Sequence, residues 1–327
     1  MRKLVFSFRI LINIVGIYLL GPHPAKPYFD DVLPAISDQI PIDAYVSSIE
    51  SSRKIKPNNQ AKIIWADTTH APTEYAIVYL HGFSASQMEG DPVHINIAKQ
   101  FHCNLYLSRL AEHGMSGSNL MQNLTAENFW ESAKEAYAIG KKIGKKVILM
   151  STSTGGTLSL QLAASYPEIA GLIMYSPNIE INKLSASLLN IPWGLQLARL
   201  VQNGNFNDVK YTNKDYPKYW SPHYRLEATV ELQNLIKATM NKKLFEKVHQ
   251  PCLTLFYYKD EAHQDNVVKV TAIKKMFSEI STPDSLKLLQ AMPNTGNHVI
   301  ASPLVSKDVE GVQKITAQFL AAKIIRK

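Results

Sequence analysis

Cysteine is scarce in this 327-residue sequence, and the two that occur, Cys103 and Cys252, lie inside apolar runs typical of buried strands. Buried free thiols are therefore expected rather than a disulfide. No Cys-x-x-Cys pair and no His/Cys spacing typical of a metal site occurs, so no metal is expected. Glycine and proline show no period and no segment repeats, which excludes collagen-like, low-complexity and solenoid architectures.

Acidic residues are outnumbered: 27 Asp and Glu stand against 35 Lys and Arg, giving a net charge of +8. The lysines are scattered and do not form a basic stripe interleaved with aromatic residues, so no nucleic-acid partner is expected. With 46% apolar and 19% charged residues, the composition is that of a folded globular protein. The length allows two domains, or one large domain with an insertion.

A long apolar run occurs at the N-terminus. Basic residues begin the chain, and a predominantly apolar stretch over residues 4–20 follows, interrupted by Arg9. This pattern is typical of a signal peptide or a signal anchor, and no A-x-A-like cleavage site follows it. An ordinary core helix is the alternative. We expect residues 1–26 to be a signal anchor or signal peptide, so that the protein is membrane-anchored with the rest of the chain outside the cytoplasm, or exported.

Strand-like and helical patterns alternate after a stretch rich in Pro, Asp and Ser over residues 27–60, which is expected to be a linker with a short helix. The alternation predicts an α/β fold, a mostly parallel sheet with helices on both faces. Residues 179–250 interrupt the alternation and are predicted to form an inserted helical cap, which leaves 61–178 and 251–327 as the core. Strands are expected at 61–66, 75–81, 103–108, 146–151, 171–176, 252–258 and 286–291.

The strongest chemical motif is Ser151-Thr-Ser153-Thr-Gly155-Gly156, which follows a buried strand and precedes a helical pattern. A sharp strand–turn–helix of this kind is a nucleophile elbow, in which small neighbours leave a serine exposed at the tip. Ser153 is therefore the predicted nucleophile. The backbone N–H of Thr154, at the helix N-terminus, is expected to stabilise an oxyanion. The alternative is a turn that only caps a helix.

A second motif, His81-Gly82-Phe83-Ser84, ends an earlier predicted strand. A loop at this place can supply the second backbone donor of an oxyanion hole, and we assign that role to the Phe83 N–H. His81 lies at the end of the strand, before the turn. We interpret it as a structural histidine that shapes the loop rather than as a catalytic base.

With these motifs the chain resembles the α/β-hydrolase superfamily, and within it the branch of monoacylglycerol lipases, carboxylesterases and serine aminopeptidases, over about residues 75–325. A run that begins at His113 looks like the His-Gly-x-Ser turn of that family, and the predicted cap lies where the branch carries its lid. Ser151 departs from the glycine usual there. The resemblance implies acyl transfer to water by a serine, with no cofactor. It does not imply which ester or amide is cleaved.

His298, after the last predicted strand, is the predicted general base of a Ser-acid-His order along the chain. Two residues of the preceding loop are candidates for the acid. Asp260 has the usual spacing from its strand, but it lies in a charge cluster expected to be solvated. Asp265 directly precedes apolar residues that lead into the next helix. We prefer Asp265, because packing on the helix side fixes a loop better than spacing from a strand.

The predicted function is that of a serine carboxylic-ester hydrolase, an esterase or lipase of monoacylglycerol-like substrates that works through an acyl-enzyme. Its partner would be a small-molecule acyl ester. Two alternatives remain: a serine peptidase or amidase, in which Glu227 or Glu231 of the cap binds a free N-terminus, and an inactive α/β-hydrolase used as a binding module. The acyl pocket is expected in the cap, lined by Leu188, Leu189, Trp193, Leu195, Leu200 and residues 219–224.

Overall fold

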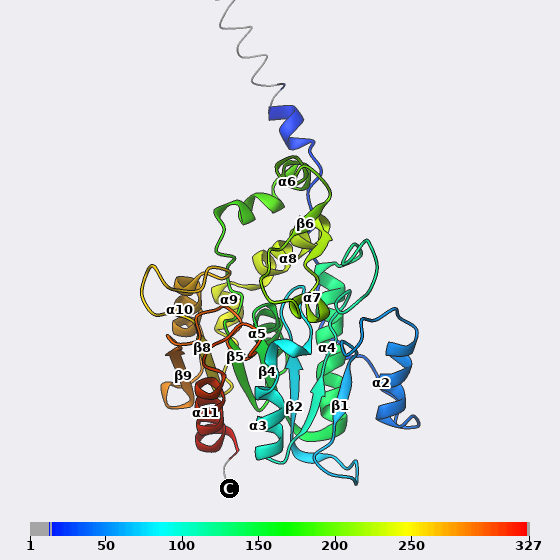
Figure 1. Cartoon of the computed structure of the whole chain (residues 1–327), viewed down its shortest axis with the longest axis vertical. Helices are drawn as coiled ribbons and strands as arrows, with labels where there is room; N and C mark the ends of the chain where they lie inside the picture. Colours follow the sequence, from blue (N-terminus) through cyan, green and yellow to red (C-terminus); the bar gives the residue numbers. More distant parts are fainter. Residues whose placement is uncertain (1–12, 14, 326–327) are drawn as a thin grey trace, which may run out of the picture.

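A seven-stranded sheet forms the centre of the molecule in the computed structural model, which describes residue 13 and residues 15–325 (Figure 1). Its strands are β1 (Lys62–Ile64), β2 (Thr73–Leu80), β3 (Asn104–Leu107), β4 (Gly144–Thr152), β5 (Gly171–Tyr175), β8 (Cys252–Phe256) and β9 (Lys287–Ala291). Their order is β1-β3-β2-β4-β5-β8-β9, with β1 antiparallel to β3 and the other neighbours parallel. The prediction of a mostly parallel sheet is confirmed.

The strands are short apolar runs because both faces of the sheet are buried. Side chains alternate between the faces along each strand. In β4, Val147 and Leu149 pack into the core on one face, while Ile148 and Met150 pack into the core on the other. An antiparallel sheet with one solvent-exposed face would alternate apolar and polar residues instead. Continuous apolar runs of strand length therefore indicate this fold class.

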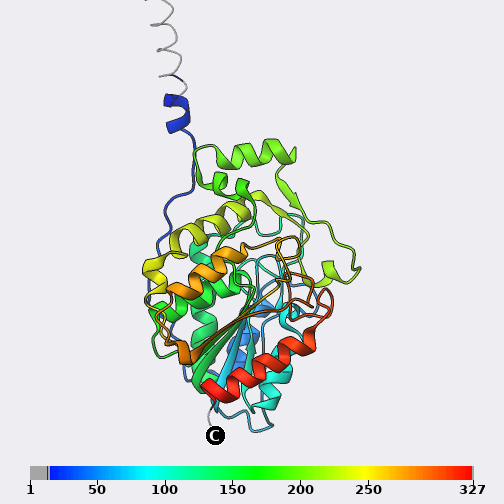
Figure 2. The same cartoon turned by 90° about the vertical axis from the view of Figure 1, so that its left-hand side faces the viewer.

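Helices cover both faces of the sheet (Figure 2). The apolar sides of α3 (Val93–Gln100) and α11 (Val309–Phe319) pack on one face. Those of α4 (Ala126–Ile143), α5 (Thr154–Ser165) and α10 (Val270–Glu279) pack on the other. Short turns complete the core: the 3-10 turns η1 (Gln87–Gly90) and η3 (Asp284–Leu286), and the π-helical η4 (Leu320–Ile324) that continues α11.

The segment between β5 and β8 forms a cap above the carboxyl ends of the strands (Figures 1 and 2). It is mostly helical, as predicted, and it also contains a two-stranded antiparallel ribbon. The elements of the cap are η2 (Leu184–Asn190), α6 (Gly194–Gln202), β6 (Phe206–Asp208), α7 (Tyr216–Tyr219), β7 (His223–Arg225), α8 (Leu226–Thr239) and α9 (Lys242–Phe245). Of these helices, α6 is the outermost.

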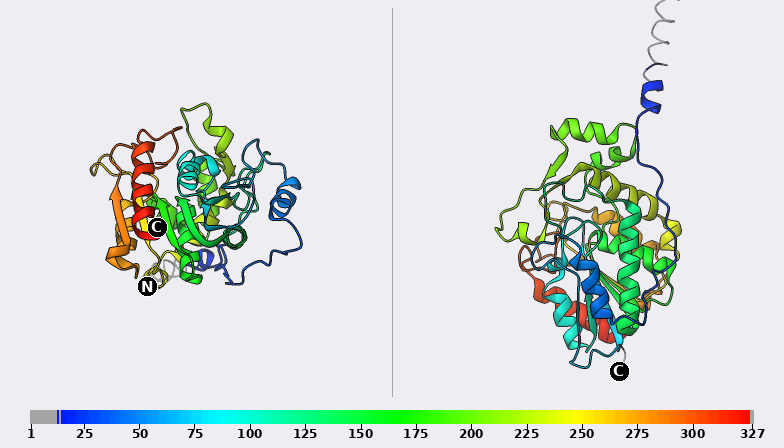
Figure 3. Two further views of the ribbon diagram at one scale, coloured as in Figure 1. Left: turned by 90° about the horizontal axis from the view of Figure 1, so that it is seen from below. Right: turned by 90° about the vertical axis from the view of Figure 1, so that its right-hand side faces the viewer.

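Residues 22–41 run as an irregular strap down the side of the molecule (Figure 3). Near the cap, the Asn234 side chain of α8 donates to the Ala25 carbonyl at 2.9 Å. Further along, the Trp130 indole N–H of α4 donates to the Asp30 carbonyl at 2.7 Å, and the buried Lys134 ammonium binds the Asp30 carboxylate at 2.7 Å. The strap therefore joins the cap to the core. The boundaries expected for the linker, core and cap stay a prediction.

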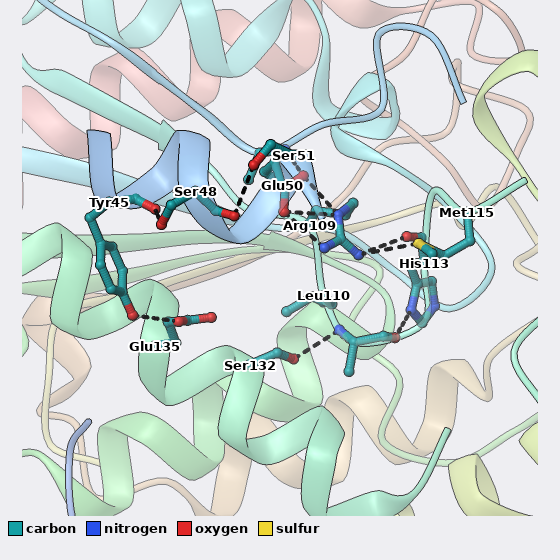
Figure 4. A network of polar contacts seen from close by, with 12 residues as sticks. Tyr45, Ser48, Glu50, Ser51, Arg109, Leu110, His113, Met115, Ser132 and Glu135 are labelled. Atoms are coloured by element: carbon teal, nitrogen blue, oxygen red, sulfur yellow. Dashed lines mark hydrogen bonds and ion pairs between the residues drawn. The ribbon is translucent and has the colours of Figure 1, made fainter. Parts of the chain in front are cut away.

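After the strap, α2 (Ile42–Ser51) is held on the core by a buried ion pair (Figure 4). The Arg109 guanidinium donates to both oxygens of Glu50, with Nη2 to Oε1 and Nε to Oε2 each at 2.8 Å. Glu50 Oε2 also accepts from the Ala61 N–H at 2.8 Å. Arg109 Nη1 donates to the His113 carbonyl at 3.2 Å, so the same network fixes the turn that begins at His113.

The expected N-terminal membrane anchor is not supported. Within residue 13 and residues 15–325, no helix is both long and apolar enough to cross a membrane. This finding contradicts the expected localisation and the membrane as a partner. Much of the apolar run on which the expectation rested, residues 4–12 and 14, lies outside the described residues.

Candidate active site

Ser153 lies at the turn between β4 and α5, with a backbone φ of 53° and ψ of −118°. A positive φ is unusual for a residue with a side chain and stores strain. The turn requires glycines next to it. A Cβ on Gly155 would lie 2.0 Å from the Leu80 carbonyl oxygen, and one on Gly156 would lie 2.6 Å from Pro177 Cβ. The sequence thus forms the sharp elbow that its motif predicts.

Asp265 and His298 are joined by a short hydrogen bond. His298 Nδ1 donates to Asp265 Oδ2 at 2.6 Å, and both side chains are buried. The other carboxylate oxygen, Oδ1, accepts from the N–H groups of Val267 and Val268 at 2.8 and 3.0 Å. These bonds leave Nε2 of the imidazole free to face a reacting group. The arrangement is that of an acid–histidine pair in a hydrolase triad.

Charge and burial act against each other in this pair. Burial disfavours the charged form of Asp265, but the positive charge of His298 and the hydrogen bonds outweigh it, and the pKa of Asp265 is lowered from its ordinary value. Burial likewise disfavours the charged form of His298. The Asp265 carboxylate outweighs burial there too and raises the pKa of His298. A carboxylate that stabilises the imidazolium in this way supports a general base.

Asp260, the other candidate for the acid, is not brought to the histidine. Its Oδ1 accepts from the His263 ring at 2.8 Å and from the backbone N–H groups of Ala262 and His263. The side chain is 51% exposed. Asp260 therefore closes its own turn on the surface.

Ser153, Asp265 and His298 follow β4, β8 and β9, so they meet at the carboxyl edge of the sheet. In the described part of the chain, Ser153 Oγ has no hydrogen-bond partner, and the contact between nucleophile and base is not made. Catalytic hydrogen bonds of this type often tighten only when substrate binds. The identification of the Asp265–His298 pair and of the Ser153 elbow therefore depends on the geometry of each, and not on a contact between them.

The two predicted oxyanion donors, the N–H groups of Phe83 and Thr154, have no acceptor among the described residues. His81 shapes the loop, as interpreted from the sequence. Its Nε2 accepts from the Leu110 N–H at 3.1 Å, so the proton is on Nδ1, which donates to the Gly82 carbonyl at 2.9 Å. Burial lowers the pKa of His81 to about 4, so the ring is neutral.

Comparison with known proteins identifies the family. A family model described as serine aminopeptidase, S33 (Hydrolase_4) matches residues 113–292, more than half of the chain. The chain belongs to this family of α/β-hydrolases. The S33 hydrolase is 24% identical over 188 residues to a thermostable monoacylglycerol lipase of Bacillus sp. (strain H-257). The matched region covers 57% of this chain and 70% of the relative.

Solved structures show the same fold. The S33 hydrolase is similar to one of the metagenome-derived lipolytic enzymes LipS and LipT, with a TM-score of 0.67 and 16% identity over 82% of this chain and 99% of that one. It is also similar to the Paleococcus ferrophilus monoacylglycerol lipase, with a TM-score of 0.56 and 14% identity over 80% and 97% of the two chains. At these identities the similarity establishes the α/β-hydrolase fold.

An aromatic wall stands beside the histidine of this S33 hydrolase. We use the term for Trp220, Tyr224 and Phe83. Trp220 is 3% exposed and packs with Ala85 and with Val299, which directly follows the histidine. The Phe83 ring meets the Tyr224 ring edge-on, with centroids 5.3 Å apart. The segment expected at the mouth of the acyl pocket therefore lies next to the oxyanion loop.

The first half of the cap does not line this wall. Leu188, Trp193 and Leu200 are 50%, 36% and 78% exposed. The Trp193 indole N–H donates to the Ile17 carbonyl at 2.9 Å, so this side chain faces the N-terminal segment. These three side chains lie on the outer side of the cap, whereas Leu189 and Leu195 are half-buried. That the first half of the cap lines the acyl pocket stays a prediction.

A groove of about 750 Å³ also separates the cap from α10. It is lined by cap residues of η2 and α8, such as Ala186 and Ile236, and by Met276 of α10. It includes neither the nucleophile nor the acid–histidine pair. The groove is therefore separate from Ser153 and from the Asp265–His298 pair.

The two cap carboxylates expected to bind a free N-terminus already have partners within the protein. Glu227 binds Arg225 at 2.6 Å and Arg199 at 2.9 Å. Glu231 Oε2 accepts from the Ala126 N–H at the start of α4, at 3.1 Å. Glu227 thus joins elements of the cap and Glu231 joins the cap to α4, so neither is available in this structure to recognise an amino group.

A buried carboxyl beside the nucleophile, Glu89, was not singled out from the sequence. It is 2% exposed and accepts from the Gly82 N–H at 2.5 Å. No sequence signal marks it, because an isolated glutamate in a loop is ordinarily exposed.

Proposed function

We propose that this S33 hydrolase is a serine carboxylic-ester hydrolase that cleaves small acyl esters, of the monoacylglycerol type, through an acyl-enzyme. The observation that carries the proposal is the buried Asp265–His298 pair at 2.6 Å, at the same sheet edge as Ser153 on its strained elbow. A histidine held by a carboxylate, at the same sheet edge as a serine on a strained turn, is the arrangement that activates a hydroxyl nucleophile.

In this mechanism, His298 Nε2 takes the proton of Ser153 Oγ as the oxygen attacks the ester carbonyl carbon. Asp265 holds the Nδ1 proton and stabilises the imidazolium that forms. The Phe83 and Thr154 N–H groups receive the oxyanion of the tetrahedral intermediate. His298 then gives its proton to the leaving alcohol, and water repeats the cycle on the acyl-enzyme. Each proton transfer uses side chains of this chain alone.

The aromatic wall supports an apolar acyl group as the part of the substrate next to the nucleophile, since apolar pockets with few polar groups bind such chains. The similarity to a monoacylglycerol lipase of Bacillus sp. agrees with this substrate class. A peptidase that selects free N-termini is less well supported, because Glu227 and Glu231 already have partners. We propose residues 61–178 and 251–327 as the catalytic core and 179–250 as the cap.

The test is Ser153→Ala. We expect turnover of p-nitrophenyl acyl esters to fall roughly 10⁴-fold or more. Thermal unfolding should be unchanged, because the hydroxyl has no partner among the described residues. A fluorophosphonate should label Ser153 in the wild-type chain.

Three outcomes would contradict the proposal. Residual activity in Ser153→Ala would reject the nucleophile. Faster cleavage of an aminoacyl amide than of any ester would favour the peptidase. A wild-type chain that neither hydrolyses esters nor reacts with the phosphonate would favour the binding module.

A further inference from the structure

A buried carboxyl group that the proposed mechanism does not use lies beside the nucleophile. Glu89 belongs to η1, in the loop that joins β2 to α3. A Cβ built on Gly82 would lie 2.9 Å from Ser153 Cβ and equally 2.9 Å from Glu89 Oε2. Gly82 therefore lies between the two side chains, and a side chain on it would collide with both. Burying a carboxyl group is costly, so a position like this requires an explanation.

The Gly82 backbone is held on both sides. Its N–H donates to Glu89 Oε2 at 2.5 Å. Its carbonyl accepts from His81 Nδ1 at 2.9 Å and from the Ala85 N–H at 3.3 Å. The Gly82 carbonyl and the Phe83 N–H belong to one planar peptide group, so fixing the first fixes the direction of the second. The Gly82 N–H that Glu89 binds belongs to the preceding His81–Gly82 peptide group. Glu89 therefore fixes the peptide on one side of the Gly82 Cα, while His81 and the Ala85 N–H fix the peptide on the other side. Together these bonds hold the backbone through Gly82 and so set the direction of the Phe83 N–H.

We propose that Glu89 is a positioning residue for acyl transfer: its carboxyl, buried beside Ser153, holds the Gly82 N–H and with it the backbone that leads to Phe83, so that the Phe83 N–H meets the oxyanion. The proposal rests on the proposed function. The Gly82 N–H is the hydrogen-bond partner of Glu89 in the described part of the chain, and a glutamine at this position can accept the same bond without a charge.

Several titratable groups lie around Glu89, so the charge of its carboxyl can change their pKa values. The titratable groups around it are Tyr79 of β2, Asp91 and His94 near the start of α3, Tyr216 of α7, and His298 with its partner Asp265.

Burial raises the pKa of Glu89 to about 7, against the opposing effects of the Gly82 N–H and the charge of His298. Burial raises the pKa of both Tyr79 and Tyr216, and it lowers that of His94 to about 4, so these three stay uncharged near neutral pH.

His298 is therefore the group whose protonation responds to Glu89. A negative charge on Glu89 raises the pKa of His298, in addition to the effect of Asp265. A protonated imidazole cannot accept the serine proton. Removing the charge at position 89 should therefore let His298 become a base at lower pH.

The first experiment separates the hydrogen bond from the charge. Glu89→Ala removes both, and we expect kcat to fall roughly 10- to 100-fold with little change in KM, since losing a whole oxyanion donor costs roughly 100- to 1000-fold. Glu89→Gln keeps an acceptor for the Gly82 N–H, and its kcat at the pH plateau should stay within about threefold of wild type. A loss in kcat without a change in KM indicates an effect on the transition state.

The second experiment reads the pH dependence of kcat/KM. In Glu89→Gln, the acid limb should move to lower pH by roughly half a unit to one unit. An NMR titration of the His298 ring, in a Ser153→Ala background, should show the same shift without any turnover. Glu231→Gln is the matched control, because it also neutralises a carboxylate that accepts a backbone N–H: Glu231 of the cap accepts from the Ala126 N–H of α4 at 3.1 Å. It should move neither kcat nor the acid limb.

The assignment would be overturned in three ways. Wild-type kcat in folded Glu89→Ala would show that the Gly82 bond is not needed. An unshifted His298 titration in Glu89→Gln would remove the electrostatic effect. A rise in KM for aminoacyl esters alone would mean that Glu89 binds a cationic substrate instead. Phosphonate labelling of Ser153 in the wild-type chain separates these results from a failure of the proposed function.

Discussion

At the scale of single residues, the acid loop shows how local hydrogen bonds decide which carboxylate serves a histidine. Asp260 and Asp265 are five positions apart in one loop. Asp260 accepts from N–H groups and a ring nitrogen of its own turn and stays at the surface. One carboxylate oxygen of Asp265 accepts from the N–H groups of Val267 and Val268. The other oxygen is therefore left for His298.

Asp265→Asn should therefore reduce kcat by roughly 10⁴-fold, because an amide no longer fixes the productive tautomer of the His298 ring. Asp260→Asn is the matched control and should keep near-normal activity. Steady-state kinetics on one acyl ester compares them directly. A collapse of activity in Asp260→Asn with normal turnover in Asp265→Asn would reverse the assignment.

Sequence order was sufficient to propose Ser153, Asp265 and His298, because each follows a strand and carries a recognisable local pattern. It was insufficient for Glu89. The burial of that side chain results from the packing of η1 against β2 and against β4, and β4 is far from η1 in the sequence. The choice between Asp260 and Asp265 also depended on the path of a loop, which no periodicity describes.

At the scale of elements, the elbow requires close approach of β4, α5 and the end of β2. Ser151 stands where the family usually has glycine, and it fits because it is fully buried with its Oγ 3.4 Å from the Ile173 carbonyl. Gly155 has no such freedom, because backbone atoms of β2 occupy the space that a Cβ would need.

Gly155→Ala should destabilise the fold by roughly 3 kcal/mol or more, since overpacking against backbone cannot be relieved by a rotamer change. Gly204→Ala is the control, because a Cβ there meets nothing within 4 Å. It should change the free energy of unfolding by less than about 0.5 kcal/mol. Urea unfolding of both variants provides the measurement. Equal stability of the two would mean that the elbow is not as tight as described.

The core elements were predictable because apolar runs of strand length and amphipathic helical patterns follow directly from burial on a two-sided sheet. The arrangement of the cap was not. The apolar residues of α6, such as Leu200 and Val201, are 78% and 83% exposed. Their spacing marks an amphipathic helix, but it does not state which surface, if any, covers the apolar side.

At the scale of the whole molecule, the strap makes the N-terminal region part of the folded unit. Lys134 is 1% exposed, and its ammonium has the Asp30 carboxylate and the Val32 carbonyl as partners on the strap. Trp130 and Tyr166 each donate to a strap carbonyl as well. A buried ammonium that loses its partners is strongly unfavourable.

Deleting residues 1–33 should therefore lower Tm by roughly 5 °C or more, because it exposes Trp130 and leaves Lys134 without its strap partners. Deleting residues 1–21 is the control. It leaves the strap intact and should keep Tm close to that of the full chain. Differential scanning calorimetry compares the three chains, and an unchanged Tm in the longer deletion would show that the strap adds no stability.

The strap also limits how the active site opens. The chain enters and leaves the cap next to two neighbouring strands, β5 and β8, and a cap attached only there could rotate as a hinged lid. The strap adds further attachments, with Pro22 accepting from the Trp193 N–H and Ala25 from Asn234 in the cap, before it continues along α4. Rigid rotation of the cap would break these bonds. We therefore expect substrate entry to depend on local movement in the segment between β6 and β7, whose Trp220 packs on Val299 beside His298.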